Sequence, residues 1–257
     1  MNTDHIISGI HNYCDRWCER CAFIDRCTMG VIEQKRWAKG KDWEPEDFFR
    51  ELEKMYPFHE NKMAEWMEEN GIDPEELEEI ELPEPDLKTQ QLEEEMHQRA
   101  TQYAKPVMQF FKQHDAGLKA RGIDLNGEAH DGRDTHDRSA MADAVEVVHW
   151  YMHFMHAKAC RAVGGIEDMN DDFIWDSPEQ SDANGSAKIT ILAIERSIAA
   201  WEVIRRHWPE QSAAIVRFEL ELKRFRGRLE RLFPKWRAFV RPGFDTEPDG
   251  FGRIEPN

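Results

Sequence analysis

Residues 139–165 read SAMADAVEVVHWYMHFMHAKACRAVGG, and this stretch decides the expected fold. Ser139 suits the N-cap of a helix and the Gly164-Gly165 pair suits its end, so a long helix should lie between them. One broad side of this helix is apolar and carries Val147, Val148, Tyr151, Phe154 and Met155. Because a helix that merely rests on a surface has a narrower apolar stripe, this one should be central, with other helices packed around it.

Three further segments repeat apolar residues at the spacing of a helix. The first covers about residues 88–114, where Pro106 should kink or divide it. The second begins near Asn184 or Ser186 and ends before the third, residues 209–232. No alternating strand pattern of useful length occurs, and short loops between long amphipathic helices make neighbours antiparallel. We therefore predict an all-α fold, a four-helix bundle.

Composition divides the chain into four parts. These are a cysteine-rich metal-binding segment (1–30), short accessory helices with an acidic arm (31–87), the bundle (88–240) and a C-terminal tail (241–257) that is either an extended strap or a frayed end. Between Lys62 and Lys88 the sequence holds eleven acidic residues and no basic one. Such an arm is either a solvated helix with a linker or a docking element for a basic protein partner.

The overall charge and hydropathy exclude several function classes. The 257 residues include 51 acidic and 34 basic side chains, a formal charge of −17, which would repel a phosphate backbone, so we expect no nucleic-acid partner. No apolar run of about 18 residues occurs, so we expect no membrane span. The opening residues lack the pattern of a secretory signal, which favours a cytoplasmic location.

Four of the five cysteines are gathered near the start of the chain. Cys14, Cys18, Cys21 and Cys27 have the spacing C-x3-C-x2-C-x5-C. Cytoplasmic thiols are kept reduced, so structural disulfides are disfavoured. Four soft thiolates can close a tetrahedral zinc site with metal–sulfur distances of about 2.3 Å, or ligate a [4Fe-4S] cluster. Free thiols or a redox-active disulfide are further alternatives, whereas Cys160 is expected to be a small buried hydrophobe.

The compact run of ligands favours iron–sulfur over zinc, because structural zinc sites commonly use two close pairs separated by a longer span. Arg16, Arg20 and Arg26 could offset the negative charge of a cluster, and Trp17 and Phe23 could limit its exposure to solvent. The C-x2-C-x5-C end of the run resembles the cluster loop of endonuclease III-type DNA glycosylases over about ten residues. That resemblance implies a [4Fe-4S] cluster on these cysteines and nothing about activity.

A second metal site in the bundle is a separate hypothesis. Along the helix of residues 139–165, one face carries Glu146, His149, His153, His156 and Cys160. On the helix that follows, Lys188, Glu195 and Glu202 are aligned at steps of seven. The E-x2-H pair of Glu146 and His149, together with Glu195, is similar to half of the ligand set of ferritin-like di-iron carboxylate bundles. The hypothesis is a metal held by Glu146, His149, His153, Glu195 and Glu202.

The polar face has two other interpretations. It is either an ion-paired structural strip or a place where His149 or His153 performs acid/base chemistry beside a carboxylate. The sequence shows no phosphate-binding loop, dinucleotide fingerprint, nucleophile elbow or H-E-x-x-H motif. Three functions therefore stay open, and with them whether the protein is an enzyme: a metal-binding protein with a redox or sensing role, a bundle-centred metalloenzyme resembling oxidoreductases, or a non-catalytic interaction protein with structural zinc.

Overall fold

The computed structural model describes residues 5–55, 67, 69, 71, 86–125, 139–170 and 177–245. The described part is all-α and contains no strand, as predicted. Each helix in it is too short or too polar to cross a bilayer. The acidic arm lies almost wholly outside the described residues, and so does the end of the tail, residues 246–257.

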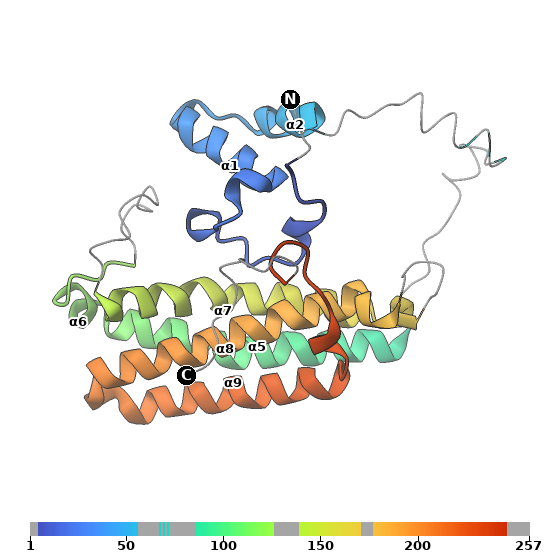
Figure 1. The fold of residues 1–257 in the computed structure, drawn as a ribbon. Helices are drawn as coiled ribbons and strands as arrows, with labels where there is room; N and C mark the ends of the chain where they lie inside the picture. The colour runs from blue at the N-terminus through green and yellow to red at the C-terminus, as the bar shows by residue number, and fades with distance from the viewer. Residues whose placement is uncertain are drawn as a thin grey trace.

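Four long helices form the body of the molecule. They are α5 (Leu87–Gln113), α7 (Ala140–Gly164), α8 (Asp182–His207) and α9 (Ser212–Leu232). Helix α7 packs against α5 and α8, and α9 closes the ring by packing against α8 and α5. Figure 1 shows that consecutive helices run in opposite directions, the arrangement of a four-helix bundle. On α7 the apolar side faces inward: Val148, Tyr151 and Met155 are each at most 2% exposed.

Side-chain caps set where the central helices begin. Ser139 Oγ accepts a hydrogen bond from the backbone N–H of Ala142 at 3.2 Å, so the predicted N-cap of α7 is confirmed. Helix α8 begins earlier than predicted, because Ser181 takes the cap position and accepts from the N–H of Asn184 at 3.4 Å. Asn184 itself lies inside the helix, where its side-chain amide donates to the carbonyl of Pro178 at 2.8 Å.

Pro106 does not divide α5, which runs as one helix from Leu87 to Gln113. We predicted that Pro106 would either kink or divide the helix, and division is wrong because of where the proline lies on the helix surface. Pro106 is exposed, while Tyr103 and Val107 beside it are buried. The missing N–H leaves the carbonyl of Gln102 without its helical partner, and Gln102 is also exposed, so water can satisfy that carbonyl.

A cluster of aromatic rings fills the bundle near the C-terminal end of α8. Trp201 is fully buried, and its indole N–H donates to the hydroxyl of Tyr103 at 2.9 Å. Phe111 stacks on the same indole with ring centroids 5.8 Å apart, and Phe218 lies 4.9 Å from it. The buried polar atoms of Trp201 and Tyr103 thus satisfy each other, which is what allows two such large rings to pack in the core.

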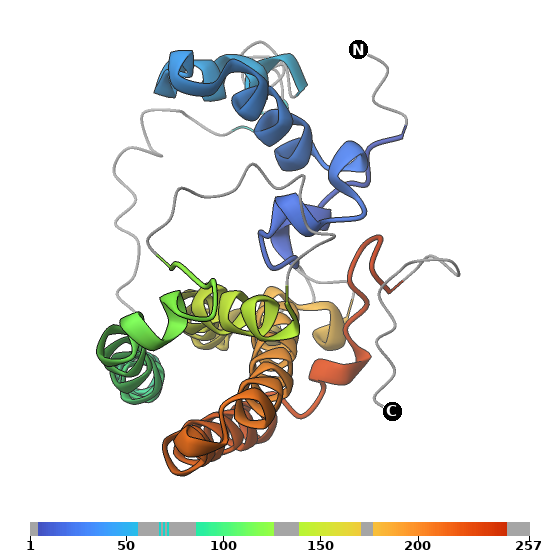
Figure 2. The ribbon, with the colours of Figure 1, turned by 90° about the vertical axis from the view of Figure 1, so that its left-hand side faces the viewer.

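The N-terminal segment packs outside the bundle, along α7 and α8. Helices α1 (Thr28–Lys39) and α2 (Pro45–Met55) form a hairpin that is held by ion pairs of Lys35 with Glu51 and of Lys39 with Asp47. The segment before α1 contains three short 3₁₀ turns, at residues 10–12, 18–20 and 24–26. Figure 2 shows this segment between α1 and the bundle, so the cysteines lie at the junction of the two parts.

The described end of the tail, residues 241–245, forms a strap over the cysteine segment (Figure 1). Phe244 lies edge-on to the ring of Phe23, with centroids 5.0 Å apart. Asp245 accepts from the ammonium of Lys188 on α8 at 2.7 Å and pairs with Arg241 at 2.9 Å. The strap therefore contacts both the cysteine segment, through Phe244, and α8, through Asp245.

Candidate metal centre

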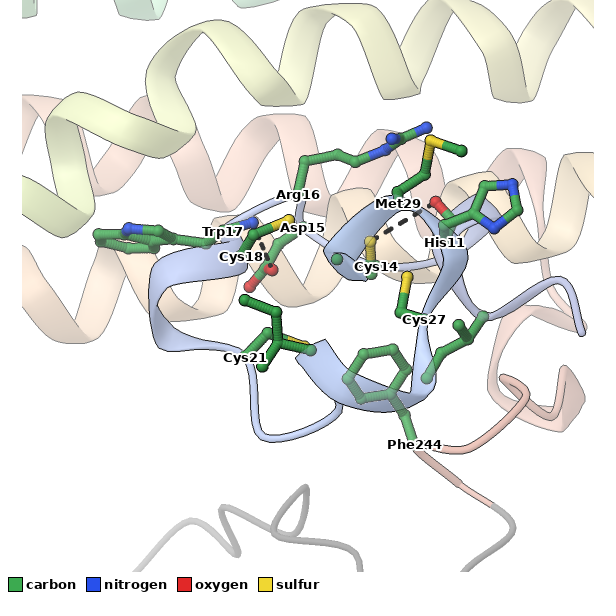
Figure 3. Close-up of a pocket in the computed structure, with 13 residues that line it drawn as sticks. His11, Cys14, Asp15, Arg16, Trp17, Cys18, Cys21, Cys27, Met29 and Phe244 are labelled. Atoms are coloured by element: carbon green, nitrogen blue, oxygen red, sulfur yellow. Dashed lines mark hydrogen bonds between the residues drawn. The ribbon is translucent and has the colours of Figure 1, made fainter. Parts of the chain in front are cut away.

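The four N-terminal cysteines line one cavity. Its volume is about 20 Å³, room for roughly one water molecule. Ile24, Met29 and Phe244 supply apolar walls. Figure 3 shows Cys14 and Cys27 with their sulfurs turned toward the middle of the ring of side chains. The structure therefore brings Cys14, Cys18, Cys21 and Cys27 to the same space, although they come from separate turns of the chain.

Backbone geometry holds the cysteine loop, residues 14–27, in this shape. Arg16 has φ +59°, the one non-glycine residue with left-handed backbone in the described part of the chain, and it turns the chain between Cys14 and Cys18. At the other end of the loop, a Cβ on Gly30 would lie 2.4 Å from the carbonyl oxygen of Ile24. Only glycine allows α1 to approach the loop this closely.

Burial favours the neutral form of three of the thiols, those of Cys14, Cys18 and Cys21. Burial raises the pKa of the Cys18 thiol to about 12, and the nearby sulfurs of Cys14, Cys27 and Cys21 add to the shift. Burial also raises the pKa of Cys21, to about 11, although the backbone N–H of Phe23 works in the opposite direction. The thiols of Cys14, Cys18 and Cys21 therefore resist ionisation in the metal-free protein, and a bound metal cation would remove that cost.

Positive groups gather at the side of the cavity nearest Cys14. Burial raises the pKa of the Cys14 thiol, while the backbone N–H and the guanidinium of Arg16 lower it. The ammonium of Lys158 donates to the backbone carbonyl of Asn12 at 2.9 Å, and burial lowers its pKa while Cys14 raises it. Positive charge beside a thiol favours the thiolate, the state in which cysteine binds a metal.

The thiol groups are not drawn together around a single point. Within the described residues, no three cysteine, histidine, aspartate or glutamate side chains are grouped closely enough to hold a metal ion. The thiol of Cys14 instead donates a weak hydrogen bond to the carbonyl of His11 at 3.5 Å. Binding would therefore require the cysteines to rotate inward from these positions. The Nδ1 atom of His11, buried at the same site, has no hydrogen-bond partner.

Asp15, next to Cys14, fastens the loop to the bundle. Its carboxylate accepts from the hydroxyl of Tyr151 on α7 at 2.7 Å and from the guanidinium of Arg196 on α8 at 2.6 Å. Arg196 also donates to the Tyr151 hydroxyl at 2.7 Å, which completes a triangle of hydrogen bonds. The backbone carbonyl of Asp15 accepts from the indole N–H of Trp150 at 3.0 Å. One residue of the cysteine loop thus contacts two helices of the bundle.

Trp17 and Arg20 form a second contact with α7. The Trp17 ring stacks on Trp150 with centroids 5.1 Å apart and planes inclined by 14°. Arg20 lies over the Trp17 ring at 4.1 Å and pairs with Asp143 at 2.6 Å and with Glu146 at 2.5 Å. Trp17 is 7% exposed and lines the cavity as well, so it shields the site as expected. The guanidinium of Arg20 therefore pairs with two carboxylates of α7 instead of neutralising the sulfurs.

A third contact involves Tyr13, which reaches the start of α8. Its hydroxyl donates to Asp182 at 3.0 Å, and Arg161 on α7 pairs with the same carboxylate at 2.5 Å. A Cβ on Gly185 would lie 2.4 Å from the Tyr13 ring and 2.6 Å from the ring of Phe239. Glycine inside this helix is therefore required by the close approach of two aromatic rings.

The structure does not assemble the second metal site that was predicted in the bundle. Glu146 pairs with Arg20, as described above. Glu195 pairs with Arg226 on α9 at 3.2 Å, and Glu202 pairs with Arg206 of its own helix at 3.7 Å. His149 and His153 lie on exposed positions of α7. Each carboxylate of the predicted ligand set has an arginine partner, and the five residues form no group that could hold a metal.

Sequence reasoning missed the residues that dock the loop. Asp15 and Arg196 are separated by 181 positions, and no motif links them. Trp17 was expected to cover the site, but its stacking on Trp150 could not be predicted, because it depends on the position of the loop relative to α7. The available signal was the density of aromatic and charged residues between the cysteines, which indicates a packed loop without identifying its partner.

Comparisons with known proteins return no relative of this chain. No protein-family model matches it, and no curated protein or solved structure is similar enough to count as a match. The case for the candidate metal centre therefore rests on its own residues and geometry.

Proposed function

We propose that the protein binds an inorganic centre through Cys14, Cys18, Cys21 and Cys27, a [4Fe-4S] cluster in the first place and zinc as the alternative, and that it serves a redox or sensing role. The observation that carries the proposal is that all four cysteines line one cavity. Four thiolates are a complete ligand set for either centre. A reducing cytoplasm, which the sequence predicts, would keep these thiols free for the metal.

The surroundings of the thiols support an anionic centre. Four thiolates with one zinc ion carry a net charge of −2, and so do four thiolates with an oxidised [4Fe-4S] cluster. Arg16 and Lys158 place positive charge beside Cys14. The backbone N–H groups of Arg16 and Phe23 lower the pKa of the Cys14 and Cys21 thiols, and such groups also tune metal-bound sulfur.

The two candidate centres make different demands on the cavity. A volume of about 20 Å³ accepts a single ion after the cysteines rotate inward. A [4Fe-4S] cluster is larger and requires the walls to move outward. Met29 and Phe244 are the walls best suited to move, because Met29 is a flexible side chain and Phe244 belongs to the strap near the end of the chain.

A sensing role follows from the connection between the loop and the bundle. Asp15 lies directly beside Cys14 and holds Tyr151 and Arg196. Binding, loss or oxidation of the centre would move Cys14 and therefore change this contact. Since Arg196 lies on α8 and Tyr151 on α7, the state of the centre would be felt in the bundle.

Anaerobic purification followed by iron, sulfide and zinc analysis tests the proposal. A [4Fe-4S] cluster predicts about four iron and four sulfide per chain with broad absorption in the visible range, and zinc predicts one zinc and no colour. Cys18→Ser should lower the metal content, and Val216→Ser, a control at an exposed position on α9, should not. Iron and zinc both missing from protein prepared without oxygen, or equal loss in the two variants, would overturn the proposal.

A further inference from the structure

Two histidines from neighbouring helices meet on the surface of the bundle. His97 on α5 and His156 on α7 have their Nδ1 and Nε2 atoms 3.1 Å apart. Their rings lie edge to face, with centroids 4.9 Å apart. His97 is exposed and His156 is half-buried, so an ion could reach the pair directly from solvent. The pair is separate from the cysteine cavity, which neither histidine lines.

The spacing of the two nitrogens matches that of two ligands on one metal ion. Zinc–nitrogen bonds of about 2.0–2.1 Å at a tetrahedral angle place two nitrogens about 3.3–3.4 Å apart. The observed 3.1 Å therefore needs an adjustment of only about 0.2–0.3 Å, within reach of small side-chain rotations. The same proximity explains a simple hydrogen bond between one protonated and one unprotonated nitrogen, which a metal would replace.

Two further groups of kinds that bind metals lie beside the pair. Glu93 lies one turn from His97 on α5, and Cys160 lies one turn from His156 on α7. Burial raises the pKa of the Cys160 thiol, and the carboxylate of Glu93 adds to the shift. A carboxylate and a thiol thus flank the histidine pair at the α5–α7 seam.

We infer that His97 and His156 form a second metal site, which binds a borderline divalent cation such as Zn²⁺ between α5 and α7 with water in the remaining positions. Imidazole nitrogen is a preferred ligand of zinc, copper and nickel. This site differs from the bundle site that the sequence suggested, because the histidine face of α7 meets α5 rather than the glutamates of α8. A metal there would clamp α5 to α7.

Zinc titration of the full-length protein tests this inference. Equilibrium dialysis with Zn²⁺ would compare the wild type with the double variant H97Q/H156Q and with His207→Gln, a matched control at an exposed position on α8. We expect the double variant to bind one zinc fewer per chain and to lose the part of the zinc-dependent rise in Tm that comes from clamping α5 to α7. The control should match the wild type, since all three proteins keep the four N-terminal cysteines.

The outcomes separate a metal site from a plain hydrogen bond. Equal zinc content and an equal rise in Tm in the double variant and the wild type would overturn the inference. If the double variant did not fold, the single variants His97→Gln and His156→Gln would be tested instead. Loss of a residue that only hydrogen-bonds to a metal ligand typically weakens metal binding by about tenfold or more, so loss of a direct ligand should weaken zinc binding by at least about tenfold. Unchanged affinity in both single variants would equally refute the site.

Discussion

Replacing Asp15 with Ala should detach the cysteine loop from the bundle. The change removes two charge-assisted hydrogen bonds, from Arg196 at 2.6 Å and from Tyr151 at 2.7 Å. Each such bond contributes about 1.5–3 kcal/mol when buried. The Arg196 side chain is 37% exposed, so water compensates part of its loss, and we expect a net effect of about 2 kcal/mol on loop docking. Tyr151→Phe, which keeps the ion pair, should cost about 1 kcal/mol.

The rate of thiol alkylation in the metal-free protein measures this effect. If the loop opens before its cysteines react, about 2 kcal/mol corresponds to roughly thirtyfold faster labelling. Urea unfolding followed by circular dichroism would report any loss of global stability. Glu202→Ala is the control, because its ion pair with Arg206 spans 3.7 Å on an exposed surface and should contribute at most about 0.5 kcal/mol. Labelling rates that agree among wild type, Asp15→Ala and Glu202→Ala would refute the docking account.

Three further predictions concern packing, pH and the α7 glutamate. Gly185→Ala should destabilise the protein by about 1–3 kcal/mol through overlap with two rings. Gly227→Ala on α9, where a Cβ would meet only the Arg231 side chain at 3.6 Å, should stabilise it by about 0.5–1 kcal/mol, and urea unfolding that ranks the two variants the other way would contradict this. Zinc affinity should rise between pH 6.5 and pH 8, because zinc displaces protons from thiols such as that of Cys18, whose pKa is about 12. A zinc affinity that does not change with pH, measured by competition with a chelator, would count against thiolate ligands. Glu146→Gln should leave metal content unchanged and lower stability by less than about 1 kcal/mol, since Glu146 is the partner of Arg20; loss of metal in this variant would revive the bundle site.

The helices of the bundle could be predicted because their signals are local. In α7 the cap at Ser139, the apolar arc and the glycine pair lie within one stretch of sequence and agree with one another. The start of α8 was misplaced because Asn184 is also a good cap residue, and only the structure shows that Ser181 takes that role. Pro106 was misjudged because the sequence does not reveal that it faces solvent.

The candidate site could be predicted only in part. The cysteine spacing indicates that the four thiols can converge, and the structure places them around one cavity. The partner of the polar face on α7 could not be inferred, because periodicity shows which residues share a face but not which helix lies opposite. Glu195 therefore seemed available to the histidines, whereas rotation of α8 in the bundle directs it to Arg226 on α9. The contacts of Asp15 are likewise set by tertiary packing.

X-ray absorption at the metal in anaerobically purified protein tests the central claim most directly. We predict a first shell of sulfur at about 2.3 Å, four sulfurs for zinc, or four cysteine sulfurs together with sulfide for iron. In Cys18→Ser this shell should lose sulfur or the metal should be lost altogether. A first shell made only of nitrogen and oxygen in the wild type, with the four cysteines fully reactive to alkylation in the same sample, would contradict a metal centre on Cys14, Cys18, Cys21 and Cys27.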